Sequence, residues 1–204
     1  MSYALGIRLR GRFRFPAILL TLVLALHAQA YDQPLSANAI REAYFLGTRQ
    51  SSLGADFLGQ YAHTIPELKV GGYTSVVRIE TPFVLVALHA SRTMNYSAQD
   101  ALRDFYNKPL PLRVYLDISY KPSASPQNSI RIKVVQNGKE VAPISDDRSP
   151  YYPRVDKRTS LPSIGEHVQL EFAPEKLDSS TVTILIDTPD GQHGETTFPL
   201  QTLR

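Results

Sequence analysis

The chain has 204 residues, of which 22 are Lys or Arg and 19 are Asp or Glu, and it contains neither Cys nor Trp. This is the composition of an ordinary globular protein, not of a disordered or collagen-like one. The lack of Cys excludes disulfides, thiol catalysis and zinc sites built on thiolates. Stability therefore has to come from a hydrophobic core.

The first 30 residues have the parts of a secretory signal peptide. Four arginines between residues 8 and 14 precede an apolar stretch at residues 17–26, and the small residues Ala28 and Ala30 follow. We expect export and cleavage after Ala30. The apolar stretch is shorter than the roughly 20 residues that a spanning helix needs, so a membrane anchor is the weaker alternative and no stable membrane insertion is expected after cleavage. The sequence predicts a periplasmic or secreted protein.

Removal of this signal peptide also changes the charge of the chain. It takes four of the 22 basic residues and none of the 19 acidic ones, which turns a formal net charge of +3 into −1. A mature chain without a basic excess is poorly suited to neutralise phosphates, so nucleic acid is not an expected partner. We expect residues 31–204 to form a single domain.

Two short helices are expected at the start of the mature chain. Ser36 can cap the first, and Gly47 can end it in the left-handed conformation. The second carries apolar residues at helical spacing, among them Phe57 and Tyr61. Residues 36–64 therefore predict a helical pair, which is too short to fold alone and has to dock on the rest of the domain.

From residue 73 onward, apolar residues recur with a period of two, which is typical of half-buried β-strands. Residues 83–88 are continuously apolar and predict a central strand covered on both faces, with a kinked edge strand around Pro82. Asn137-Gly138 favours a type I′ hairpin turn. Further strands are expected near residues 77–79, 112–120, 130–134, 139–144, 168–172, 182–186 and 196–200.

One helix is expected between these strands. Ser97 suits its N-cap, Asp100 occupies the capping-box position, and Pro109 closes it. The strands show no regular alternation with helices, so a parallel sheet is not expected. The sequence predicts a mainly β protein: an antiparallel immunoglobulin-like β-sandwich at residues 73–201, with the N-terminal pair of short helices docked on it and one helix inserted between strands.

Three segments of the chain carry a resemblance. AYFLGTR from residue 43, TPF from residue 81 and YSAQDA from residue 96 resemble segments that a group of uncharacterised exported bacterial proteins has in the same order. The resemblance covers roughly residues 36–120. It implies export and a common architecture, and it brings no catalytic residue with it.

Motifs for catalysis and metal binding are absent from the sequence. G-x-S-x-G, S-x-x-K and H-E-x-x-H do not occur, so we predict no catalytic, cofactor-binding or metal-binding residue and no cofactor. Asp187, Asp190 and Glu195 flank a turn and leave calcium as an alternative, although their spacing differs from that of a calcium loop. A shared histidine site would have to be assembled by the fold from residues 63, 89, 167 and 193.

The most informative irregular segment is residues 145–163, because a loop of this length is uncommon unless it binds something or moves. Tyrosine and arginine are effective interface anchors, since they combine apolar area with directional hydrogen bonding. We therefore predict that Arg148, Tyr151, Tyr152 and Arg154 bind a partner. The alternative is that the segment contains an edge strand, or that its tyrosines pack on the sheet edge.

The leading interpretation is an exported, soluble, non-enzymatic β-sandwich module that binds a protein or cell-envelope partner. The alternatives are a carbohydrate- or calcium-binding module at the loop end of the sandwich and, less favoured, a hydrolase. A hydrolase would bring His, Asp and Ser or Glu into one pocket. A calcium module would bring several carboxylates together, and an interaction module would present an aromatic patch or an unpaired edge without either.

Overall fold

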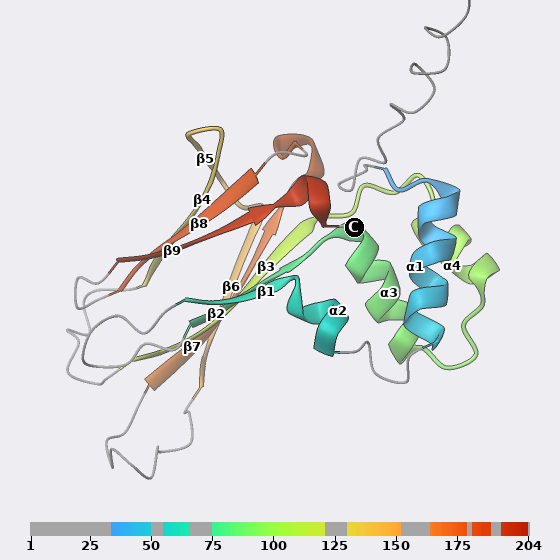
Figure 1. The fold of residues 1–204 in the computed structure, drawn as a ribbon, viewed down its shortest axis with the longest axis horizontal. Coiled ribbons are helices and arrows are strands. Elements are labelled where there is room, and N and C mark those ends of the chain that lie inside the picture. Colours follow the sequence, from blue (N-terminus) through green and yellow to red (C-terminus); the bar gives the residue numbers. More distant parts are fainter. Residues whose placement is uncertain are drawn as a thin grey trace, which may run out of the picture.

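A computed structural model describes residues 34–49, 55–65, 75–120, 130–151, 164–178, 181–188 and 193–203. These residues form a mainly β structure with two antiparallel sheets and a smaller group of helices at one end of them (Figure 1). The expected signal peptide at residues 1–30 lies outside the described residues. Within them, no helix has the length and apolar character needed to cross a membrane.

Nine strands make up the described parts of the two sheets. Sheet A has the order β1-β2-β3-β7-β6, and sheet B has the order β5-β4-β8-β9. The mainly β, antiparallel prediction is thereby confirmed. The strands are β1 (Ala62–Ile65), β2 (Ser75–Glu80), β3 (Leu112–Tyr120), β4 (Arg131–Gln136), β5 (Lys139–Val141), β6 (Ser145–Tyr151), β7 (Ile164–Phe172), β8 (Thr181–Asp187) and β9 (His193–Pro199).

The inner faces of the two sheets share one hydrophobic core. Alternate apolar residues of the expected strands supply it, because side chains that are two residues apart point to the same face. At one side the sheets close on each other: the His63 ring on β1 stacks on Phe198 of β9, with centroids 4.1 Å apart. The main contributions come from Leu112, Val114, Leu116, Ile118, Val168, Leu170, Phe172, Val182, Ile184 and Ile186.

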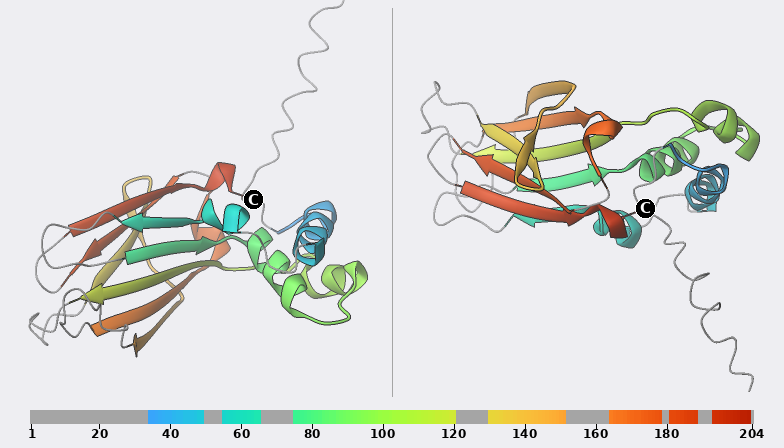
Figure 2. Two further views of the ribbon diagram at one scale, coloured as in Figure 1. Left: turned by 60° about the horizontal axis from the view of Figure 1, so that its bottom comes forward. Right: turned by 90° about the horizontal axis from the view of Figure 1, so that it is seen from above.

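Three of the helices pack on one another and form a unit beside the sheets, which we call the helical unit (Figure 2). It consists of α1 (Ala37–Arg49), α3 (Pro82–Arg92) and α4 (Ala98–Phe105). Helix α2 (Ala55–Gly59) precedes β1, and the 3₁₀ turns η1 (Pro174–Lys176) and η2 (Leu200–Thr202) follow β7 and β9. Helix α1 thus docks mainly on α3 and α4.

The segment expected as a central strand at residues 83–88 is wrong as a strand prediction, because it lies in α3. Thr81 caps this helix, with its side-chain oxygen accepting from the Val84 N–H at 3.4 Å, and Pro82 occupies the first turn. Proline suits that position because its missing N–H would be unsatisfied there anyway. A short, wholly apolar run does not distinguish a buried strand from a buried helix. The flanking Thr-Pro pair is the signal for the helix.

The sequence predicts that Gly47 ends the first helix, but Gly47 lies within α1. A Cβ atom at this position would stand 2.2 Å from the carbonyl oxygen of Ala87 on α3. Two helices approach this closely only where no side chain intervenes. Gly47 therefore permits the contact between α1 and α3.

The second helix is shorter than the sequence predicts. Residues 62–64 belong to strand β1, whose His63 pairs with Val77 on β2. Tyr61 is fully buried just before this strand, while Phe57 on α2 is only partly buried. Pairing with a sheet edge overrides the helical spacing, which covers too few residues to specify a helix by itself.

Two local predictions are confirmed in detail. The Ser97 hydroxyl accepts from the Asp100 N–H, and the Asp100 carboxylate accepts from the Ser97 N–H, which completes the capping box of α4. Asn137 and Gly138 have φ values of 51° and 73° and form the turn between β4 and β5. Both features depend on a few adjacent residues, which is why the sequence reveals them.

Candidate functional site

The outward side chains of β2, β3, β7 and β6 form a polar surface, which we call the sheet A face. Strand pairing arranges these side chains in rows across the sheet. A depression of about 520 Å³ lies over two of the rows. From β2 to β6 the rows are Glu80–Arg113–Glu171–Ser145, Arg78–Tyr115–Gln169–Asp147 and Val76–Asp117–His167–Ser149.

The row beside the helical unit is a network of paired charges. Arg113 Nε donates to Glu171 Oε1 at 2.7 Å, and Arg78 Nε stands 3.7 Å from Glu80 Oε1. Glu80 is only 7% exposed. Burial raises the pKa of its carboxyl above the ordinary glutamate value, although the neighbouring arginines act in the opposite direction. This row forms the border of the sheet A face that lies beside the helical unit.

The middle row presents an aromatic ring between polar groups. The Arg78 guanidinium lies 4.9 Å from the centroid of the Tyr115 ring, a cation–π contact. Burial and the nearby Glu80 carboxylate raise the pKa of Tyr115, so its hydroxyl stays protonated. Gln169 and Asp147 continue the row toward the sheet edge.

The third row contains an exposed histidine–aspartate pair. His167 Nδ1 lies 2.5 Å from Asp117 Oδ1, and the two side chains are 52% and 51% exposed. Ser149 on β6 is the direct pairing partner of His167, so Ser, His and Asp follow one another across three strands. This order resembles a catalytic triad. An oxyanion hole, however, needs donors aimed at a carbonyl above the face, whereas strand N–H groups point within the plane of the sheet.

Arg148, one of the four predicted partner-binding residues, has structural contacts. It lies opposite Val168 on the core side of β6, where its Nε and Nη2 donate to Asp146 at 2.8 and 3.0 Å. Its Nη1 donates to the Ile130 carbonyl at 2.8 Å, just before β4 of sheet B. Arg148 thereby joins the edge of sheet A to sheet B. Arg148 is also among the residues that line the depression.

The other three predicted residues lie at or beyond the end of β6. Tyr151 is the last residue of that strand and pairs with Gly165. Tyr152 and Arg154 fall outside the described residues. The structure thus shows an edge strand over the first part of the segment expected as a binding loop, which is the alternative that the sequence left open.

The sequence did not identify the outward residues of β3 and β7 as residues of one candidate site. The alternation of Arg113, Tyr115 and Asp117 with apolar residues was visible, and it marked these side chains as outward. What the alternation does not reveal is that β3 pairs with β7, which begins more than 40 residues later in the chain. Only this pairing brings Tyr115 beside Gln169 and Asp117 beside His167.

The four histidines considered for a shared site lie in four different environments. His63 is at the seam of β1 and β9, His167 is on the sheet A face, and His89 lies on α3 between the rings of Tyr96 and Phe105. His193 pairs with Asp187 at 2.7 Å. Within the described part of the chain, no three His, Asp or Glu side chains are placed to hold a metal ion. Of the other calcium candidates, Glu195 pairs with Leu185 on β8 and Asp190 lies outside that part.

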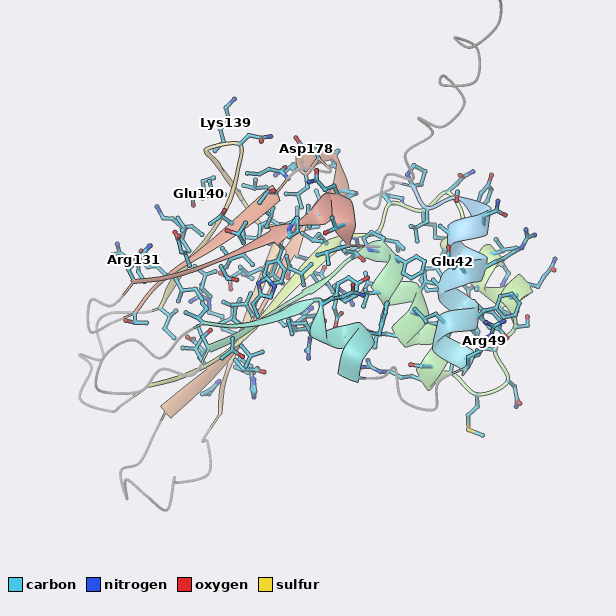
Figure 3. All side chains as sticks on the ribbon, viewed as in Figure 1. Glu42, Arg49, Arg131, Lys139, Glu140 and Asp178 are labelled. Atoms are coloured by element: carbon cyan, nitrogen blue, oxygen red, sulfur yellow. The ribbon has the colours of Figure 1, made fainter. Side chains whose placement is uncertain are left out.

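A second depression lies by the β4–β5 hairpin and is lined in part by the exposed residues Lys139, Glu140 and Asp178, which are labelled in Figure 3. Its polar groups bind one another. Asn137 Nδ2 donates to Asp178 Oδ2 at 2.9 Å, and the Asp178 N–H donates to Gln136 Oε1 at 3.0 Å. These bonds fix the hairpin against the segment after η1, so this depression has a structural explanation.

Comparisons with known proteins gave no match to a protein family, to a curated protein or to a solved structure. The resemblance to exported bacterial proteins therefore stays a prediction, and the function has to be argued from the geometry of the chain itself.

Proposed function

We propose that this chain is an exported, non-enzymatic binding module of immunoglobulin-like sandwich architecture, and that it binds a cell-envelope or protein partner through the sheet A face. The observation that carries this proposal is the depression over two rows of outward polar side chains from four paired strands. The signal peptide expected at residues 1–30 supports export.

A sheet face suits recognition because its side chains are held on a rigid platform. The backbone of each row is fixed by pairing to its neighbours, so little conformational entropy is lost when a partner binds. Strand β6, at the edge of sheet A, is less suited to binding a partner. Strand β6 carries Pro150 and the core-side pair Asp146–Arg148, and such features discourage pairing with a further strand.

The test is capture of material from the native envelope fraction by immobilised residues 31–204. The double variant Asp147→Ala/Gln169→Ala removes two polar groups of the face without touching the core, and we expect about tenfold weaker capture, which corresponds to about 1.4 kcal/mol. The matched control is Lys133→Ala/Thr197→Ala, on the outer side of sheet B, which should leave capture unchanged. Equal capture by both double variants would exclude the sheet A face as the binding site.

A hydrolase is the second candidate, because Ser149, His167 and Asp117 are in line on this face. A serine hydrolase would be labelled by a fluorophosphonate at Ser149, and Ser149→Ala would abolish the labelling. The binding module is expected to show no labelling at this residue. Labelling that depends on both Ser149 and His167 would replace the proposed function with acyl transfer.

A further inference from the structure

We infer that the partner of the sheet A face is an uncharged polysaccharide with vicinal hydroxyl groups, lying across the strands. This inference rests on the proposed function, because it names the chemistry of that same site. It follows from the charge balance of the face, from the hydrogen-bonding groups that border the depression and from the scarcity of exposed apolar side chains there.

Most charged side chains of the face have a partner within it, and its balance is acidic, because the three rows carry four carboxylates and two guanidinium groups. Arg113 pairs with Glu171, the Arg78 guanidinium lies beside Glu80, and His167 bonds to Asp117. A phosphate-rich ligand would have to break such pairs to reach the guanidinium groups, and a surface without a basic excess gives it no long-range attraction. The charges of the face thus argue against an anionic ligand.

The groups that border the depression are suited to hydroxyls. The carboxylates of Asp147 and Asp117 accept hydrogen bonds, the carboxamide of Gln169 both donates and accepts, and the Ser149 hydroxyl does the same. A planar carboxylate or carboxamide can engage two adjacent hydroxyls at once. Adjacent strands of a sheet lie about 4.8 Å apart, which is comparable to the length of one sugar ring.

A protein partner fits this face less well than a polysaccharide does. Protein interfaces are centred on buried aromatic and aliphatic anchors. On the face, Tyr115 is the aromatic ring of the described rows, and Arg78 lies over it. The large hydrophobic side chains that are most exposed in the described part of the chain lie elsewhere, namely Phe45, Met94, Tyr106 and Ile144.

The experiment uses the native envelope fraction as the probe, divided into four portions. One is untreated, one is digested with protease, one is oxidised with periodate, which cleaves vicinal diols, and one is presented at high salt. Capture by the wild-type mature chain is compared with capture by Asp147→Ala/Gln169→Ala, and their difference defines face-dependent capture. Lys133→Ala/Thr197→Ala is again the matched control.

We expect face-dependent capture to survive protease and high salt and to fall at least tenfold after periodate. Loss after protease but not after periodate would mean a protein partner, and loss at high salt would mean a charged one; either result overturns this inference and leaves the proposed binding face standing. Absence of face-dependent capture from the untreated portion would overturn the proposed function together with the inference.

Discussion

The helical unit and the sheet A face both combine aromatic rings with polar side chains, but they use them differently. In the helical unit, the polar atoms join separate elements. The Tyr44 hydroxyl on α1 donates to the Tyr96 carbonyl before α4, and the Tyr96 hydroxyl donates to Asp104 on α4, both at 3.0 Å. The Tyr96 ring also meets the edge of His89 on α3. These groups therefore hold three helices together.

On the sheet A face, the side-chain bonds run between neighbours on one surface. The pair Asp117–His167 joins two strands that the backbone already joins over their whole length. Such bonds add little to the fold, because exposed ion pairs contribute about 0 to 1 kcal/mol. Polar groups are thus needed for stability where they connect elements, and they are available for binding where they lie on a surface already fixed by strand pairing.

The largest effect on the free energy of unfolding is expected when the buried and the outward side of β3 are compared. Leu116→Ala, on the buried side of β3, should lower the free energy of unfolding by about 3 kcal/mol, because it removes core contacts and leaves a cavity. Asp117→Asn, on the outer side, should change it by at most about 1 kcal/mol. Urea unfolding of both variants measures the difference. Similar losses for both would mean that the face is part of the stabilising structure.

The next largest effect concerns the approach of α1 to α3. Gly47→Ala should lower the free energy of unfolding by about 2 kcal/mol, because the new methyl group would overlap the Ala87 carbonyl and force the helices apart. The control is Gly59→Ala, where a Cβ would meet no atom within 4 Å. Thermal unfolding should show the loss only for the first variant, and a stabilised Gly47→Ala protein would contradict this contact.

A smaller effect is expected from one hydroxyl of the helical unit. Tyr44→Phe removes the bond to the Tyr96 carbonyl and should cost about 1 kcal/mol, a typical value for a partly buried hydrogen bond. Tyr106→Phe serves as the control, since Tyr106 is 50% exposed. If the two substitutions cost the same in urea unfolding, then the hydroxyl of Tyr44 does not contribute to holding the helices.

The last and smallest effect is a change of stability with pH, caused by Glu80 at the border of the sheet A face. The folded-state pKa of Glu80 is raised by burial, so the folded chain holds this proton more tightly than the unfolded chain does. The contribution of Glu80 to stability is therefore largest below its ordinary pKa and declines as the pH rises through the raised value. Glu80→Gln, which mimics the protonated form, should lack this decline. Parallel pH profiles for wild type and variant would show that the carboxyl is not desolvated.

The fold was readable from the sequence wherever a feature depends on neighbouring residues. Period-two alternation revealed β3, and the Ser97–Asp100 pair revealed the start of α4. Residues 83–88 resemble a strand in the sequence because their helix has no polar face to show its period, as it is buried on nearly all sides. The start of β6 resembles a loop, since Pro150 and the charges of an edge strand look like a turn-rich segment.

Local patterns in the sequence predict a signal peptide, and they reveal the lack of disulfides, the hairpin turn at Asn137-Gly138 and the outward character of Tyr115 and Asp117. Which of the outward residues lie next to one another depends on the tertiary structure. Pairing of β3 with β7 and β6 is a long-range choice, set by burial of the opposite faces of these strands in one core. Because that choice depends on the sum of many apolar contacts and not on any short motif, the sheet A face could be recognised only in the folded chain.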